Sequence, residues 1–140
     1  MLHKASIVFP MAALAGLTFA VLLLIPVRRF RAGRAGRIAY DDFRYGESAR
    51  VPPEVALPNR NMMNLLELPM LFYVACLTSF AADRVDAAGL ALAWSYVGLR
   101  FAHSAIHLTY NRVQHRLLAF GASNVALVMI WTHLLRRLTA

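Results

Sequence analysis

Four long runs of apolar residues alternate with short polar segments along the chain. The runs cover residues 5–27, 61–82, 87–110 and 117–135, and the first contains no charged side chain. At about 1.5 Å per residue, a helix of this length crosses the hydrocarbon core of a bilayer, which is about 30 Å thick. The pattern therefore predicts an all-α membrane protein in which residues 1–140 form a single domain, a bundle of four transmembrane helices.

Two other interpretations of the first run agree less well with its pattern. A helix of a soluble bundle needs a polar face, and residues 5–27 have none. A cleaved signal peptide would explain Lys4 and the small residues near Ala13, but its apolar core spans only about 7–15 residues. The run instead continues to Val27 and then meets several arginines. We expect a helix that is retained in the membrane.

Composition and charge support this topology. Hydrophobic residues make up 59% of the chain, more than the roughly 45–50% of soluble domains, and charged residues only 16%. The net charge of +8 would otherwise suggest a nucleic-acid partner. Most of the arginines, however, lie in the segment 28–60 and in the joint 111–116. Because basic loops remain in the cytoplasm, we expect both segments there and both termini outside the cytoplasm. Basic loops beside a membrane also contact anionic lipids, so we expect membrane lipids as partners and no nucleic-acid partner.

Polar side chains inside the predicted helices are the candidates for function, because a bilayer makes them costly. Arg60, Asn64 and Glu67 follow the spacing i, i+4, i+7 and share one face of the helix 61–82. A second stripe, on the helix 87–110, consists of Tyr96, Arg100, His103, His107 and Tyr110. Hydrogen-bond donors outnumber the single carboxylate, so the two stripes predict a pocket for a small anion.

Two alternatives use the same residues. Glu67 and Arg100 could form one buried ion pair that fixes the register of the helices. His103 and His107, at i and i+4, could instead bind a metal or a haem, with His115 nearby, but this spacing alone is weak evidence and we expect no metal. The single cysteine, Cys76, excludes an intramolecular disulfide and is expected to serve packing.

Two segments carry a family resemblance. The segments 58–73 (PNRNMMNLLELPMLFY) and 100–116 (RFAHSAIHLTYNRVQHR) resemble the MAPEG family, the membrane-associated proteins of eicosanoid and glutathione metabolism. The resemblance covers four helices, a long basic first loop and nearly the whole chain. The spacing of Arg100, His103 and Arg116 is similar to that of the prostaglandin E synthase branch, and the chain looks closest to bacterial members, which implies a bacterial inner membrane.

The resemblance implies a homotrimer that binds glutathione as a cosubstrate in a U shape between neighbouring protomers. Arg116 would be the catalytic residue that stabilises the glutathione thiolate. Arg60, Asn64 and Glu67 would hold the charged ends of the peptide. Arg100 and His103 would line the pocket, and His107 stands where family enzymes usually place a tyrosine.

The activity implied is that of a glutathione-dependent transferase or peroxidase. Its substrates would be lipophilic small molecules, either electrophiles or lipid hydroperoxides, that reach the pocket from the bilayer. Some members of the family bind lipids without catalysis, so the alternative is a non-enzymatic lipid-binding or scaffold trimer of the same fold.

Overall fold

The computed structural model describes residues 3–139, and within them the chain is helical with connecting loops and no strand. Short 3-10 turns precede the first long helix and interrupt the first loop, as η1 (Lys4–Ile7) and η2 (Tyr40–Phe43). The five α-helices are α1 (Val8–Arg34), α2 (Pro53–Leu66), α3 (Pro69–Ala81), α4 (Ala87–Leu108) and α5 (Val113–Thr139).

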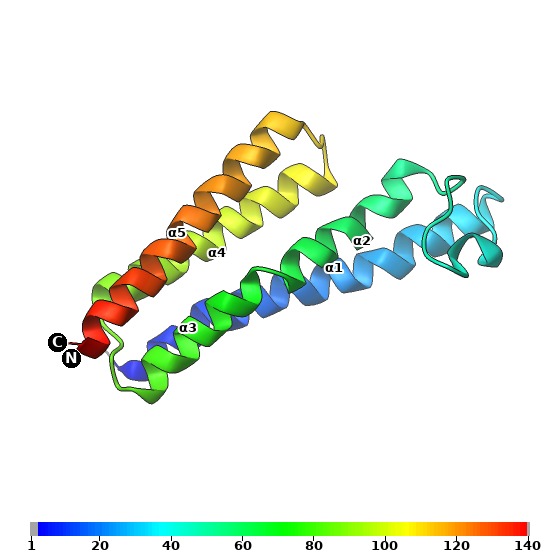
Figure 1. Cartoon of the computed structure of the whole chain (residues 1–140). Coiled ribbons are helices and arrows are strands. Elements are labelled where there is room, and N and C mark those ends of the chain that lie inside the picture. Colours follow the sequence, from blue (N-terminus) through cyan, green and yellow to red (C-terminus); the bar gives the residue numbers. More distant parts are fainter. Residues whose placement is uncertain (1–2, 140) are drawn as a thin grey trace.

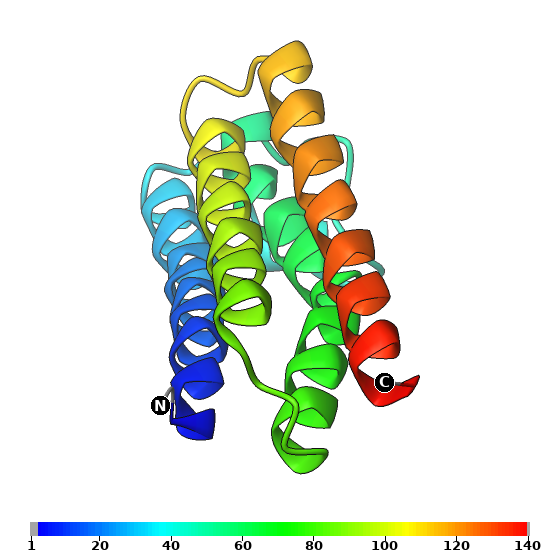
Figure 2. The same cartoon turned by 90° about the vertical axis from the view of Figure 1, so that its left-hand side faces the viewer.

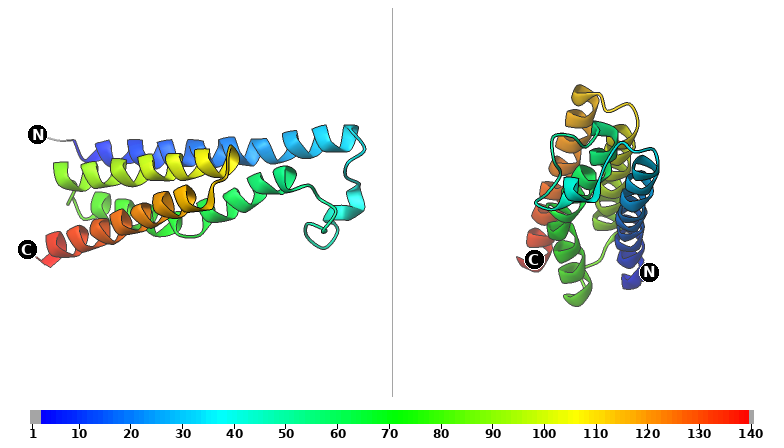
Figure 3. Two further views of the ribbon diagram at one scale, coloured as in Figure 1. Left: turned by 90° about the horizontal axis from the view of Figure 1, so that it is seen from above. Right: turned by 90° about the vertical axis from the view of Figure 1, so that its right-hand side faces the viewer.

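The helices form four roughly parallel rods. Helices α2 and α3 follow one another along α1, while α4 and α5 form a second pair beside them (Figure 1). Figure 2 shows the four rods from the end of the bundle where α1 begins and α5 finishes. The joint between α3 and α4 lies at that end, and the segment 35–52 and the α4–α5 joint lie at the opposite one (Figure 3). The predicted four-helix bundle is confirmed.

The chain is an integral membrane protein by the length and composition of its helices. Within residues 3–139, three segments are long and apolar enough to cross a membrane: Lys4–Arg34, Pro53–Ala81 and Val113–Thr139. The fourth rod, α4, carries a stripe of polar side chains, and these face the interior of the bundle. The buried members of this stripe are Tyr96, Arg100, His103, Ser104 and His107. Inward-facing polar groups are the arrangement that a bilayer requires.

The helices extend beyond the apolar runs that predicted them. Helix α1 continues to Arg34 instead of ending at 27, and α2 begins at Pro53 instead of 61, so the expected loop 28–60 shrinks to residues 35–52. Hydrophobicity marks only the part of a helix that lies in lipid, whereas hydrogen bonding continues until the backbone is interrupted. The interruptions here are Gly36, with a φ of 68°, and Pro53 at the first turn of α2.

The predicted helix 61–82 is two helices. The backbone of Glu67 leaves helical geometry, with φ −77° and ψ −92°. Pro69 follows, and a proline has no N–H to continue the helical hydrogen bonding. Glu67 is exposed at this break.

A small polar cluster ties α4 to α5 at the end of the bundle where α5 finishes. Asp86 caps α4 by accepting a hydrogen bond of 2.8 Å from the N–H of Gly89. The same carboxylate accepts from Nε2 of His133 at 2.9 Å and pairs with Nε of Arg137 at 3.2 Å. A Cβ on Gly89 would lie 3.2 Å from Oδ1 of Asp86, so glycine suits this crowded position.

Arg28 joins three helices at the other end. Its guanidinium donates to the carbonyl of Glu54 in α2 at 2.7 Å and to the carbonyl of Leu108 in α4 at 3.0 Å. These are charge-assisted hydrogen bonds, which are stronger than neutral ones. They hold the ends of α1, α2 and α4 together beside the joint that leads to α5.

The segment 35–52 is ordered around one buried carboxylate. Asp42 accepts hydrogen bonds of 2.8 Å from the N–H of Ala39 and from the hydroxyl of Ser48, and it pairs with Arg50 at 3.0 Å. The hydrogen bond from Ala39 is the largest cause that lowers the pKa of Asp42, followed by that from Ser48. These donors favour the ionised form and fix the loop between α1 and α2.

Acid is expected to loosen this segment. Because the native pKa of Asp42 lies below the ordinary value of 3.8, ionised Asp42 stabilises the fold at neutral pH. That contribution is lost as the pH falls below 3.8 toward the native pKa. Cleavage by pepsin within 35–52 should therefore accelerate over this window. Asp42→Asn should be cleaved faster by trypsin at neutral pH, whereas Asp41→Asn, at an exposed neighbour, should match the wild type. Equal rates for both variants would contradict the role of Asp42.

Candidate functional site

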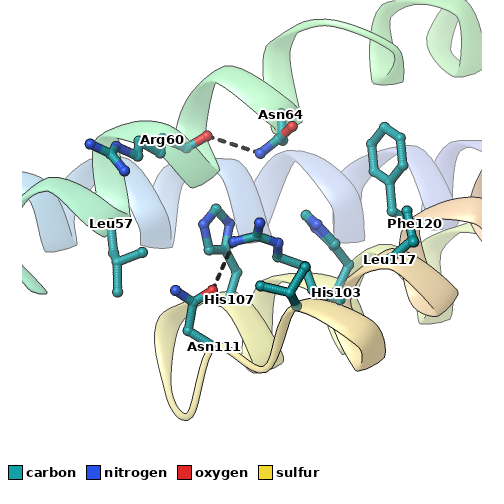
Figure 4. Close-up of a pocket in the computed structure, with 10 residues that line it drawn as sticks. Leu57, Arg60, Asn64, His103, His107, Asn111, Leu117 and Phe120 are labelled. Carbon is teal, nitrogen blue, oxygen red and sulfur yellow. Dashed lines mark hydrogen bonds between the residues drawn. The ribbon is translucent and has the colours of Figure 1, made fainter. Parts of the chain in front are cut away.

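A cavity of about 410 Å³ lies between α2, α4 and the start of α5, near the α4–α5 joint (Figure 4). This volume is within the roughly 300–1,000 Å³ of small-molecule sites. Its walls are both polar and apolar. The polar lining residues are Arg60, Asn64, His103, His107, Asn111 and Arg116, and the apolar ones are Leu57, Val113, Leu117 and Phe120.

Helix α2 supplies one wall of the cavity. Arg60 and Asn64 lie one helical turn apart, and the side-chain amide of Asn64 donates to the carbonyl of Arg60 at 3.0 Å (Figure 4). The side chain of Arg60 is exposed, so its charge stands at the entrance. The i, i+4 spacing in the sequence thus places both groups on the side of α2 that faces α4 and α5.

Helix α4 supplies two buried histidines. Nδ1 of His107 lies 3.3 Å from Oδ1 of Asn61, which also accepts from the hydroxyl of Ser104 at 3.3 Å. An amide oxygen only accepts, so this contact requires that neutral His107 carries its proton on Nδ1, which makes Nε2 an acceptor. The ring of His103 packs between those of His107 and Phe120, with centroids 5.7 Å and 5.5 Å away.

The joint between α4 and α5 orients Arg116. Nη1 of Arg116 donates to Oδ1 of Asn111 at 2.8 Å (Figure 4). Asn111 has a φ of 46°, in the left-handed region that asparagine adopts more readily than most residues. Helix α5 begins at Val113, so Arg116 lies at the end of its first turn. There the positive end of the helix dipole adds to the guanidinium charge.

The structure brings five of the seven sequence-predicted site residues together and leaves two apart. Arg60, Asn64, His103, His107 and Arg116 line one cavity.

Arg100 and Glu67 do not line it. Arg100 is completely buried, and its Nη2 donates to the backbone carbonyl of Asn64. Its Nε and Nη1 have no hydrogen-bond partner within the described residues. No ion pair joins Glu67 to Arg100 in residues 3–139, so the alternative of a buried Glu67–Arg100 pair is wrong for this structure.

The sequence alone did not single out Asn61 and Asn111. Asn61 is completely buried and connects α2 to α4 through Ser104 and His107. A signal was present, because Asn61 is one of three asparagines within the segment 58–73. Asn111 gave no comparable signal, since an asparagine in a joint is most often only a turn residue.

The histidines do not gather further metal ligands. In the part of the chain from 3 to 139, no three His, Cys, Asp or Glu side chains lie close enough to hold a metal ion. His115 instead places Nδ1 3.1 Å from the hydroxyl of Tyr110.

The electrostatics of the cavity suit an anion. Two guanidinium groups, those of Arg60 and Arg116, belong to its lining, and no carboxylate of residues 3–139 does. Guanidinium forks match carboxylate and phosphate groups.

These features define an integral membrane protein that is a bundle of four helical rods with a polar cavity at one end. The sequence model of the MAPEG family matches residues 7–136, and the chain belongs to that family. No curated protein and no solved structure matches the chain. Membership supports, in general terms, a membrane function related to glutathione, such as that of a transferase or a peroxidase.

Proposed function

We propose that the protein is a glutathione-dependent transferase or peroxidase that acts on lipophilic electrophiles or lipid hydroperoxides. The observation that carries the proposal is the cavity beside α5, where the described lining has two arginines and no carboxylate. Glutathione is a small peptide with two carboxylates and a thiol, and it fits a cavity of about 410 Å³ rich in donors.

Arg116 is the proposed catalytic residue. An ordinary thiol has a pKa of about 8.5 and is mostly protonated at neutral pH. A guanidinium close to the sulfur favours the thiolate, and the first turn of α5 adds partial positive charge. The hydrogen bond from Arg116 to Asn111 holds the guanidinium at the cavity without neutralising it, because an amide carries no charge.

The thiolate would react in one of two ways. With an electrophilic lipid, its sulfur forms a C–S bond while the C–O bond of an epoxide or the π bond of a conjugated alkene breaks. A proton then reaches the oxygen or carbon that has received the electron pair. With a lipid hydroperoxide, sulfur attacks the terminal oxygen, the O–O bond breaks, and an alcohol leaves after protonation. The sulfenic acid formed on glutathione then reacts with a second glutathione to give the disulfide and water. In both cases the two electrons of the new bond come from glutathione.

The remaining residues have supporting roles in the proposal. Arg60 and Asn64 bind the carboxylates and amides of the peptide, His103 packs against it, and Nε2 of His107 accepts from one of its N–H groups. Arg100 is a positioning residue, since it contacts the carbonyl of Asn64 rather than the cavity.

Assembly and orientation complete the proposal. The exposed Glu67 would contact glutathione held by a neighbouring protomer of a homotrimer. The cavity lies at the arginine-rich end of the bundle, and basic segments remain in the cytoplasm. In a bacterial inner membrane, glutathione would enter from the cytoplasm and the lipophilic substrate from the bilayer.

A glutathione titration tests the proposal. Millimolar glutathione should raise the unfolding temperature of the purified protein, because a ligand that binds only the folded state stabilises it. S-methylglutathione should act similarly, whereas free cysteine should not, and calorimetry would give the affinity. If glutathione leaves the unfolding temperature unchanged while lipids raise it, the protein is the non-enzymatic lipid-binding alternative.

A further inference from the structure

A second groove, of about 650 Å³, lies outside the glutathione cavity, between the last turns of α1 and the loop that follows. Its floor is apolar, and arginines stand beside it. The residues used below are Pro26, Arg29, Phe30, Gly33, Arg34 and Phe43. Nothing in the proposed reaction uses this groove.

The outer wall of the groove is held in place by the first loop. The guanidinium of Arg29 stacks 4.2 Å from the ring centre of Phe43 and pairs with Glu47 at 3.0 Å. Asp42, next to Phe43, is fixed by its own hydrogen bonds to Ala39 and Ser48. The groove is therefore preformed, and it stays open toward the outside of α1.

One face of α1 leads directly into the groove. At 100° per residue, Phe19, Leu23, Pro26 and Phe30 fall on one stripe, and the next positions on it are Gly33 and Arg34. Phe19, Leu23 and Phe30 are 64%, 67% and 67% exposed. A stripe of this kind in a transmembrane helix contacts acyl chains, so its upper end lies where lipid headgroups begin.

Three arginines in or near the groove are compensated by carboxylates of the protein. Arg29 is neutralised by Glu47, Arg37 by Glu54 and Arg50 by Asp42.

Arg34 differs from these arginines. It is exposed and forms no ion pair within residues 3–139. A cation at the end of an apolar stripe, beside an apolar groove, is complementary to an amphiphile with a negative head.

The geometry points to an anionic phospholipid as the occupant of this groove. The part of an acyl chain nearest the glycerol would lie along Phe30 and Pro26. The glycerol itself would lie over Gly33, and the phosphate would bind Arg34. A second copy of the chain fits less well, because it would bring another arginine-rich end against this one. The lipid would act as a bound structural ligand of the first loop.

Thermal unfolding of the detergent-solubilised full chain tests this inference. Added phosphatidylglycerol should raise the unfolding temperature by about 3 °C or more, and the rise should shrink at high salt. Phosphatidylcholine with the same acyl chains, and inorganic phosphate alone, should have little effect. Equal rises with both lipids, or with phosphate alone, would overturn the inference.

Two variants test separately whether lipid binding depends on the charge of Arg34 and on the open space of the groove. Arg34→Gln removes the cation, and Arg136→Gln is its control, since Arg136 is also exposed in the last turn of a long helix. Gly33→Phe places an aromatic ring in the groove without changing the charge. The backbone tolerates this change, since a Cβ at Gly33 would meet nothing within 4 Å. Gly16→Phe is its control, at an equally open position on the same helix.

Only Arg34→Gln and Gly33→Phe should lose the response to phosphatidylglycerol. If Gly33→Phe and Gly16→Phe respond as the wild type does, the groove is not the site. If Gly33→Phe changes the oligomeric mass and the lipid has no effect, a second copy covers the groove. The measurement needs no glutathione, so failure of this inference leaves the proposed glutathione site unaffected.

Discussion

Replacing Arg116 by alanine is expected to lower kcat/KM for glutathione-dependent turnover about a hundredfold or more, the usual effect of removing a group that stabilises developing or resident negative charge. The physical reason is the loss of the cation that favours the glutathione thiolate. The ultraviolet absorbance of the bound thiolate should disappear in the same variant. Arg116→Lys should keep part of both signals, since it keeps the charge but not the planar contact to Asn111.

Arg112→Ala is the matched control for this experiment. Arg112 lies one turn before Arg116, is exposed, and does not line the cavity. Its removal should leave turnover and the thiolate signal near the wild-type values. A similar loss in both variants would show that general positive charge at this end of the bundle, rather than Arg116, supports the reaction.

Replacing Phe72 by alanine is expected to cost the largest amount of stability, about 3–5 kcal/mol. Phe72 is completely buried, and its ring stacks on that of Tyr96 with centroids 4.8 Å apart. Helix packing in a bilayer depends on van der Waals contact more than on the hydrophobic effect, so the void between α3 and α4 is not refilled by lipid. Unfolding in mixed micelles, followed by circular dichroism, would measure the change.

The comparison for Phe72 is a phenylalanine that faces outward. Phe19 is 64% exposed on α1, and Phe19→Ala should change the free energy of unfolding by less than about 0.5 kcal/mol. If both variants lose similar stability, the contact between Phe72 and Tyr96 does not hold α3 against α4.

The number and place of the helical rods were predictable, because a bilayer permits few alternatives. An uninterrupted run such as residues 5–27 can only be buried in lipid as a helix. The boundaries were less predictable, because helices continue through polar residues such as Arg31 and Arg34 outside the lipid. The break at Glu67 could have been inferred from Pro69, but a transmembrane helix also tolerates a proline without breaking.

The part of the candidate site that depends on spacing within one helix was predictable. Arg60 and Asn64, and likewise His103 and His107, are neighbours on one helix, so their spacing alone places each pair on one face. Arg100 lies on the same stripe as His103, yet its guanidinium passes to the carbonyl of Asn64. That direction depends on how closely α2 approaches α4, which no periodicity within either helix determines.

Asp86 joins α4 to α5 at one end and residues 109–112 join them at the other, so the α4–α5 pair can tilt against α2 only as one body. The carboxylate binds both Gly89 of α4 and His133 of α5 at one end, and the cavity lies near the other, beyond His107. The lever arm along α4 is about 30 Å at 1.5 Å per residue. One degree of tilt about the end at Asp86 therefore moves the cavity wall by about 0.5 Å over that length. Three degrees would change the width of the opening by about 1.6 Å over that length, while the packing at the Asp86 end stays almost unchanged.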